Sequence, residues 1–156
     1  MALASGLLGA APVMAQAPIE GTWLMDKGAE LTVAPCGDRY CGTMSWIVIP
    51  KENRAQCLAD KEKFAAQMVD IHNPDPALRS RSDIGLAIMI FKPTSDPQKF
   101  DLRAYDPEKG ETKSGLIAQV VDGKMNIIGC QYGMCGVGRT WPRIPTRAGA
   151  PGFSCG

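Results

Sequence analysis

Two stretches at opposite ends of the chain decide the fold prediction: Gly21-Thr22-Trp23 and Arg139-Thr140-Trp141-Pro142-Arg143. A guanidinium that lies over an indole ring gains about 0.5–2 kcal/mol of cation–π attraction, and planar Arg does this better than Lys. Contact of Trp23 with Arg139 or Arg143 would join the first strand to the last. We therefore assign a structural role, the closure of a β-barrel, to Gly21, Trp23, Arg139, Trp141 and Arg143.

Between these stretches the chain has the pattern of an all-β protein, in which short apolar segments alternate with Gly, Pro and Asp turns. Asp122-Gly123 is the strongest hairpin signal, because a type I′ turn needs a positive φ at both positions. The continuously apolar run 84–91 indicates a strand buried on both faces. Eight strands with mostly short connections predict an antiparallel up-and-down barrel, and a two-sheet sandwich is the alternative. The predicted strands cover residues 19–26, 29–35, 39–49, 84–91, 99–105, 111–121, 124–132 and 137–144.

One long connection, residues 50–83, interrupts the strands. Its first half has apolar residues near helical spacing over residues 56–68. Its second half contains Asn73-Pro74-Asp75-Pro76, which excludes a helix because each proline restricts the residue before it. Long ordered loops are often functional, so this segment is a candidate for function. The tail after Ile144 is rich in Pro, Gly and Ala, and we expect it to be loosely held except where Cys155 pins it.

Charge and hydropathy exclude two classes of protein. The chain has 156 residues, the size of one domain, and its 17 basic and 16 acidic side chains give a net charge of +1. This balance argues against nucleic-acid binding, which needs clustered Lys and Arg facing phosphates. No apolar run approaches the roughly 20 residues of a membrane-spanning helix, so no membrane span is predicted.

The first 17 residues have the features of a signal peptide. They contain no charged side chain, residues 1–9 are apolar and small, and Ala15-Gln16-Ala17 has the small-x-small form of a signal-peptidase site. A buried N-terminal helix is the alternative, although two glycines and a proline would break it. Cleavage after Ala17 would leave residues 18–156 as a single domain; cleavage after Ala15 would avoid a proline directly after the cut.

Six cysteines also favour export to the periplasm or the medium, since an even number in a small exported chain is typical of disulfides. A zinc site is the alternative, but Cys-x4-Cys spacing is longer than zinc sites favour. Cysteines that face each other across an antiparallel hairpin can reach the separation that a disulfide requires. We therefore predict Cys36–Cys41 and Cys130–Cys135, with Cys57–Cys155 as the remaining pair.

A family resemblance rests on motifs that follow one another from Gly21 to Arg143. They are Gly21-Thr22-Trp23, Pro35-Cys36-Gly37, Cys41-Gly42, Asn73-Pro74-Asp75-Pro76-Ala77-Leu78-Arg79-Ser80-Arg81, Gly85-Leu86, Tyr105-Asp106-Pro107, Gly110, Gly129-Cys130, Trp141 and Arg143. In these the chain resembles the small exported bacterial proteins grouped as domain of unknown function 2147, which are described as lipocalin-like. Ser82-Asp83 and Lys113 depart from the family pattern. The resemblance implies an exported lipocalin-like β-barrel and implies no reaction.

The interior of an eight-stranded barrel can hold one small ligand. Met and aromatic side chains form adaptable apolar cavities, and Arg binds anionic groups with two parallel hydrogen bonds. The candidate ligand-binding residues are therefore Trp23, Trp46, Met44, Met89, Phe100, Arg79, Arg81 and Tyr105, with Met25 and Met125 as further lining. The alternative is that the apolar side chains fill a solid core and that the two arginines fix the loop, by pairing with Asp75, Asp83 or neighbouring carbonyls.

Metal and catalytic sites are not favoured by the motifs. Asp70, Asn73 and Asp75 carry the oxygen ligands that Ca²⁺ prefers, but Asn and Asp beside proline commonly set turns. His72 is the only histidine, and the patterns Gly-x-Ser-x-Gly, Ser-x-x-Lys and His-Glu-x-x-His are absent from the sequence. We predict no metal or cofactor and favour no catalytic activity.

Two functions are compatible with these features. The first is an exported lipocalin-like protein that binds a small apolar or lipid-like molecule inside the barrel, with residues 50–83 as a lid over one mouth. The second is a cell-envelope interaction protein whose barrel holds no ligand and whose residues 73–81 dock a partner. No oligomeric state is assigned.

Overall fold

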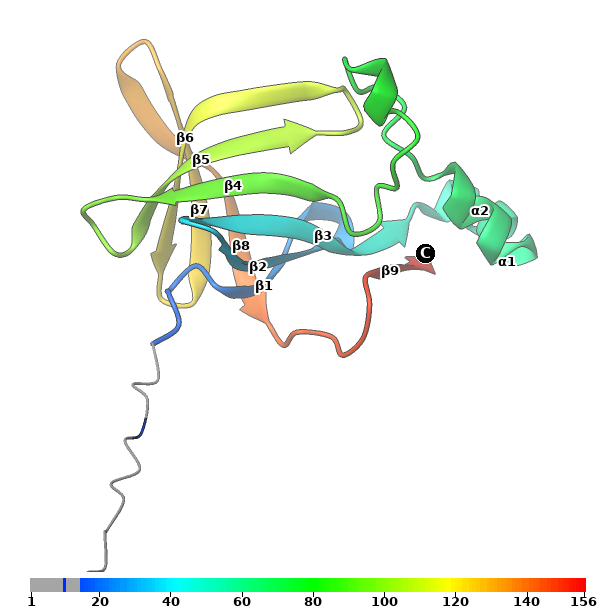
Figure 1. The fold of residues 1–156 in the computed structure, drawn as a ribbon, viewed down its shortest axis with the longest axis horizontal. Coiled ribbons are helices and arrows are strands. Elements are labelled where there is room, and N and C mark those ends of the chain that lie inside the picture. The colour runs from blue at the N-terminus through cyan, green and yellow to red at the C-terminus, as the bar shows by residue number, and fades with distance from the viewer. Residues whose placement is uncertain (1–9, 11–14) are drawn as a thin grey trace, which may run out of the picture.

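The chain forms a closed antiparallel barrel in the computed structural model, which describes residue 10 and residues 15–156 (Figure 1). Each strand pairs with the next in the chain, and the last barrel strand pairs back with the first through Thr22–Ile144 and Trp23–Arg143. The predicted eight-stranded up-and-down topology is therefore confirmed. The barrel strands are β1 (Gly21–Leu24), β2 (Glu30–Cys36), β3 (Arg39–Ile49), β4 (Ala87–Pro93), β5 (Lys99–Asp106), β6 (Glu111–Val121), β7 (Lys124–Gln131) and β8 (Met134–Ile144).

Turn residues set most strand boundaries where the sequence predicts them. Asp122 and Gly123 have φ values of 49° and 70°, as the type I′ hairpin between β6 and β7 requires. The prediction differs most at β4, which begins at Ala87 rather than at residue 84, and at β8, which begins at Met134 rather than at residue 137. Gly85 has a φ of 79°, a left-handed conformation within a turn that the Leu86 N–H closes by donating to the Asp83 carbonyl, while the Gly85 N–H donates to the Met44 carbonyl of β3.

A ninth strand, β9 (Gly152–Cys155), lies in the tail that we expected to be loosely held. It pairs in parallel with the second half of β3, from Trp46–Gly152 to Ile49–Cys155. Side-chain contacts of β9 itself are the Cys57–Cys155 disulfide, the stacking of Phe153 on Phe64 at 6.4 Å and the hydrogen bond from Trp46 to Ser154. Before the strand, Arg147 lies 4.3 Å from the Trp46 ring centre and forms an ion pair with Glu30 at 2.8 Å. A parallel partner far along the chain leaves no signal in local sequence.

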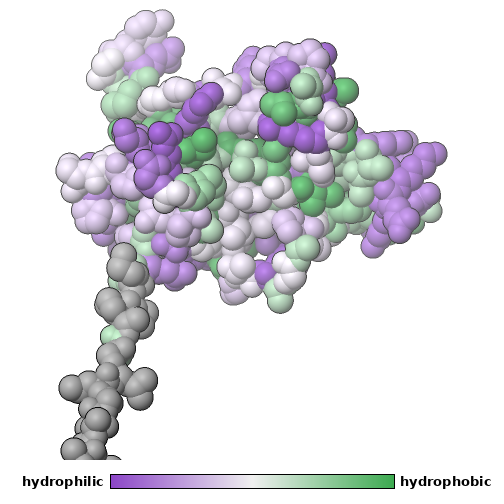
Figure 2. Space-filling view, viewed as in Figure 1, coloured by the Kyte–Doolittle hydropathy of each residue, from purple (hydrophilic) through white to green (hydrophobic). Residues whose placement is uncertain are grey.

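The long connection contains two short helices instead of the one expected over residues 56–68. They are α1 (Arg54–Ala59) and α2 (Lys61–Gln67), preceded by the 3-10 turn η2 (Lys51–Asn53). Asp60 separates them, because its backbone is extended (φ −157°, ψ 93°) and its carboxylate accepts a hydrogen bond from the Lys63 N–H as an N-cap. Figure 2 shows this helical segment, at the right, as one of the most hydrophilic parts of the surface.

The three disulfides are those predicted from the spacing. Cys36–Cys41 and Cys130–Cys135 each join the two strands of a hairpin, and Cys57–Cys155 joins α1 to β9 across a sequence separation of 98 residues. No described cysteine is free. Within the described part of the chain, no helix is long and apolar enough to cross a membrane. The predicted signal peptide falls mainly on residues 1–9 and 11–14, which lie outside the described residues.

Candidate ligand-binding site

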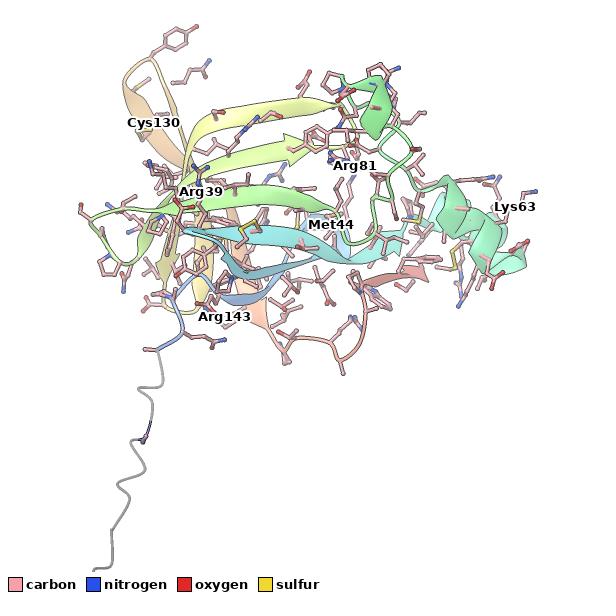
Figure 3. All side chains as sticks on the ribbon, in the orientation of Figure 1. Arg39, Met44, Lys63, Arg81, Cys130 and Arg143 are labelled. Atoms are coloured by element: carbon pink, nitrogen blue, oxygen red, sulfur yellow. A yellow bond between two sulfur atoms is a disulfide. The ribbon has the colours of Figure 1, made fainter. Side chains whose placement is uncertain are left out.

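One end of the barrel is closed by the residues that decided the fold prediction. The Arg143 guanidinium lies 4.3 Å from the Trp23 ring centre and donates hydrogen bonds to the Glu20 and Pro18 carbonyls (Figure 3). Trp23 Nε1 donates to the Ile19 carbonyl at 2.9 Å, so the segment that enters β1 is pinned across this end. Both Trp23 and Ile19 are fully buried.

Gly21 is needed for this closure. Its φ of 122° lies in the region that favours glycine, and a Cβ at this position would overlap the Arg143 guanidinium. The two arginines of the last strand therefore differ in role. Arg143 covers Trp23, whereas Arg139 pairs with Asp26 in the 3-10 turn η1 (Asp26–Gly28), at 2.7 Å, on the rim of the opposite end.

The other end of the barrel, which we call the open end, has fewer fully buried side chains than the closed end. Near the closed end Trp23, Leu31, Phe91 and Met125 are fully buried. Tyr40, near the closed end, is only partly buried, and toward the open end, where β1 leads into η1 and β5 turns into β6, several of the inward apolar side chains are only partly buried, although they pack on the same core. These partly buried residues are Met25, Met44, Ala104 and Leu116.

The predicted apolar ligand-binding residues separate into three places. Trp23 and Phe100 belong to the buried core, and Phe100 makes an edge-to-face contact with Tyr40 at 5.8 Å between ring centres. Met89 and Met44 lie on the inner face, the first buried and the second partly exposed. Trp46 lies apart from the core cluster, under Arg147 and β9, where its Nε1 donates to the Ser154 hydroxyl at 3.3 Å.

Two of the three polar candidates, Arg81 and Tyr105, meet at a buried carboxylate in the long loop. Asp70 is fully buried, and Tyr105 donates to its Oδ1 at 2.5 Å. Its Oδ2 accepts from Asn73 Nδ2 at 2.7 Å and from Arg81, whose Nε and Nη2 lie at 2.9 and 2.8 Å. Arg79 lies outside this cluster and donates from Nε to the Asn73 carbonyl at 2.7 Å.

This arrangement fixes a loop instead of providing oxygens for a metal. The oxygens of Asp70 already accept from N–H and O–H donors, and Asn73 Oδ1 and Asp75 Oδ1 accept from the backbone N–H groups of Asp75 and Ala77. Across the described residues no group of three or more His, Cys, Asp or Glu side chains is arranged to hold a metal. The turn-setting interpretation of these residues accounts for all of these contacts.

Burial and hydrogen bonding act in opposite directions on the pKa of Asp70. Burial raises this pKa, but the hydrogen bonds from Tyr105, Asn73 and Arg81, with the positive charge of Arg81, outweigh burial and hold it below its ordinary value. Burial also raises the pKa of Tyr105, and the charge of Asp70 adds to that effect. Asp70 is therefore an ionised acceptor and Tyr105 a neutral donor at neutral pH.

Asp83, close to this network, has a different environment. Its pKa is raised by burial first and by the negative charge of Asp70 second. Its Oδ1 is buried and has no hydrogen-bond partner among the described residues. Asp83 was one of the partners expected for Arg79 and Arg81, beside Asp75 and neighbouring carbonyls. Arg81 binds Asp70 instead, and Arg79 donates to a neighbouring carbonyl, that of Asn73.

The loop lies against the outer face of the barrel. Phe91 and Leu102 pair with one another on the inner face, so Ile90 and Arg103, which also pair, point outward, as do Tyr105 and Thr112. The β5–β6 hairpin approaches the loop so closely that a Cβ on Gly110 would overlap the His72 carbonyl. These contacts hold the loop on β5 and the β5–β6 turn, on the outer face, whereas a lid over one mouth was expected.

A pocket of about 320 Å³ lies between the loop and this outer face. In Figure 3, Arg81 lies between the loop and the ribbon of β4 and β5, at the edge of this region. A second hollow, of about 440 Å³, lies between α1 and α2 and is lined mainly by polar side chains. The first pocket is lined by Asn73, Pro74, Arg81, Ala87, Ile88, Ile90, Arg103, Tyr105 and Thr112.

Sequence reasoning missed Arg103, Ile90 and the Glu30–Arg147–Trp46 cluster. The alternation in β5 indicates that Arg103 points outward, opposite Leu102, but only the folded loop makes it part of a pocket. The Arg147–Trp46 pair has the same 4.3 Å geometry as Arg143–Trp23, yet no motif marks it.

Comparison with known proteins agrees with this geometry. A solved structure described as protein HP1028 from the human pathogen Helicobacter pylori, which belongs to the lipocalin family, matches with a TM-score of 0.55 and 18% sequence identity. The match covers 81% of this chain and 82% of that chain, and at this identity it supports the fold alone. A search of curated proteins gives no significant match. The family model for uncharacterized proteins conserved in bacteria (DUF2147) matches residues 21–143, and the chain therefore belongs to that family.

Proposed function

We propose that this protein is exported and binds a small apolar or lipid-like molecule inside its barrel, entering at the open end. The observation that carries the proposal is the change in burial along the inner face. Met25, Met44, Ala104 and Leu116 are apolar, point to the core and remain partly exposed. Unbranched methionines change rotamer at low cost, so they can move aside for an apolar chain that then packs on Met89.

Export is supported by two independent features. The 17 N-terminal residues have the pattern of a signal peptide, and the three disulfides are of the kind that persists in an oxidising compartment. Residues 18–156 are then the mature domain, in the periplasm or secreted. An envelope location would give the protein access to lipid-like ligands.

The test begins with the ligand that the protein acquires during expression. The purified protein is denatured and extracted with organic solvent, and mass spectrometry of the extract is compared with that of a disulfide-bonded protein of similar size. The refolded protein is then titrated with fatty acids of increasing length. Binding raises the melting temperature as the ligand concentration rises, because the ligand favours the folded state.

A matched pair of variants locates the site. Ala104→Phe places a large side chain among the inward residues of the open end, whereas Ala34→Phe adds the same group on the exposed face of β2. We expect Ala104→Phe to abolish the ligand-induced rise in melting temperature and Ala34→Phe to preserve it. Equal binding by both variants, or an empty extract together with no binding of any probe, would refute the proposal.

The second candidate function, envelope interaction, is favoured by a different observation. The tip of the β7–β8 hairpin projects beyond the barrel in Figure 1 and is fixed by the Cys130–Cys135 disulfide. Tyr132, Met134 and Val137 on this hairpin are 92%, 75% and 57% exposed. A rigid hairpin that presents large apolar side chains is a feature of contact surfaces, so this function takes first place if the barrel binds no ligand.

A further inference from the structure

The pocket between the loop and the outer face is separate from the barrel interior. Its strand residues alternate with the core residues: Ile90 and Arg103 line it, while Phe91 and Leu102 on the same strands are buried inside. Its volume, about 320 Å³, is near the lower limit of ordinary small-molecule pockets. It can therefore take a small ligand without any change in the core.

The pocket has an apolar floor and a positively charged wall. Ala87, Ile88 and Ile90 of β4 form the floor, and Ile90 is only partly buried. Arg103 lines the wall. Within residues 15–156, none of the ion pairs of the protein includes Arg103, so its guanidinium has no carboxylate within ion-pair distance there. None of the residues that line the pocket is acidic.

The second arginine of the pocket is held in place. Arg81 uses Nε and Nη2 on Asp70, which leaves its Nη1 without a hydrogen bond to any residue in the described ranges. Asp70 neutralises most of its charge, so the uncompensated charge of the pocket belongs to Arg103. Tyr105 and Asn73 are fixed by the same carboxylate, so these walls are ordered before a ligand binds.

We infer that this pocket binds a small amphipathic carboxylate, with the carboxylate on Arg103 and the apolar chain on Ile88 and Ile90. A planar guanidinium matches a carboxylate through two parallel N–H···O bonds, and the charge at Arg103 has no partner of its own in the described structure. The apolar floor excludes a purely ionic ligand, because such a ligand would leave the apolar side chains of the floor exposed to water. This site shares Ile88 with the barrel core, and Tyr105 packs against that core, while its other lining residues lie outside the core cluster.

The experiment titrates sodium decanoate, below its micellar concentration, into the purified oxidised protein and follows amide and methyl NMR signals. We expect shifts at Ile88, Ile90, Arg103 and Thr112. Arg103→Gln should weaken binding by about tenfold, since it removes a charged hydrogen-bond donor. Lys92→Gln removes one charge from exposed β4, outside the pocket, and should change the affinity less than about twofold because an exposed charge is screened.

Three controls keep the outcome decisive. Decanol, which lacks the charge, should bind the wild type about as weakly as decanoate binds Arg103→Gln. Thr112→Phe, at an exposed position, should fill the pocket and remove the shifts without lowering the melting temperature. Ala104→Phe should leave decanoate binding in the pocket unchanged, which separates this site from the barrel site. Shifts confined to Met25 and Met44, no shifts, or equal affinity for decanol and decanoate would overturn the inference.

Discussion

Removing the Arg143 side chain should destabilise the barrel through its contact with Trp23. The guanidinium stacks on a fully buried indole and holds the Glu20 and Pro18 carbonyls, while Trp23 holds the Ile19 carbonyl from below. The two side chains therefore pin the same segment of chain. Loss of either frees part of what the other holds, so their effects on the free energy of unfolding should be coupled.

The magnitudes follow from burial and hydrogen bonding. Arg143 is exposed, so its cation–π contact contributes about 0.5–1 kcal/mol, and two hydrogen bonds from a solvated guanidinium add about 0.5–1 kcal/mol each. Arg143→Ala should thus cost about 1.5–3 kcal/mol. Trp23→Leu loses a fully buried ring and should cost about 3 kcal/mol. The double variant should lose about 1–2 kcal/mol less than the sum.

The assay is urea unfolding at neutral pH with the disulfides intact, followed by far-UV circular dichroism. Arg143→Lys serves as the conservative variant; it should recover little, because an ammonium group lacks the planar face and the fork of donors. Arg139→Ala is the matched control, since Arg139 pairs with exposed Asp26 and should cost under about 1 kcal/mol without coupling to Trp23. Additive losses for Trp23 and Arg143, within about 0.5 kcal/mol, would refute the closure argument.

Three further predictions concern the loop and the tail. Gly110→Ala should cost about 2–4 kcal/mol, because it combines a left-handed φ with overlap of the His72 carbonyl. Gly123→Ala has open space around it and should cost about 1–2 kcal/mol. Equal costs of the two variants in thermal melts would exclude tight docking of the loop. Asp70→Asn should cost about 2–3 kcal/mol at neutral pH. The folded-state pKa of Asp70 is lowered, so its contribution to the free energy of unfolding is present above the ordinary Asp pKa and is lost as the pH falls through the folded value. Asp70→Asn should therefore flatten the dependence of the unfolding free energy on pH in that acidic range. An unchanged slope would contradict the assignment. Replacing both cysteines of Cys57–Cys155 by Ser should cost about 4–5 kcal/mol in the chain-entropy model, because this disulfide closes a loop across a sequence separation of 98 residues. The same change at Cys36–Cys41, with a separation of 5, should cost about 2 kcal/mol. The reverse order in denaturant titrations would show that the tail strand adds little to the barrel.

Local patterns predict the barrel well because its strands pair with their chain neighbours. The predicted bounds of β3 and β6 agree with the structure, since each strand borders a hairpin turn whose glycine has a positive φ: Gly37 before β3 and Gly123 after β6. Alternation of apolar and polar residues then assigns each side chain to one face. Disulfides across hairpins follow from the same local geometry, as Cys36–Cys41 illustrates.

Contacts between distant segments are less accessible from one sequence. The choice between Arg139 and Arg143 depends on the register of β8 against β1, which only the closed barrel sets. Trp46 appears as an inward residue by alternation from Met44, but a register shift between Glu30 and Leu31 places it under the tail. The outer pocket depends on where the connection between β3 and β4, residues 50–86, comes to rest, which Asp70 and Tyr105 decide from positions 35 residues apart.

The two proposed sites use different parts of the fold, and this separation has an energetic reason. The loop is held by a charged, hydrogen-bonded cluster on the outer face, centred on Asp70, while the closed end is held by Trp23 and Arg143 on β1 and β8. The contacts of these two clusters share no residue, so perturbing one leaves the hydrogen bonds of the other in place. The open end lies opposite the closed end and is bounded by the partly exposed Met25 and Met44, whose side chains take part in neither cluster. A barrel fixed at one end and along one outer face can therefore adapt at its mouth without losing its closure or its docked loop.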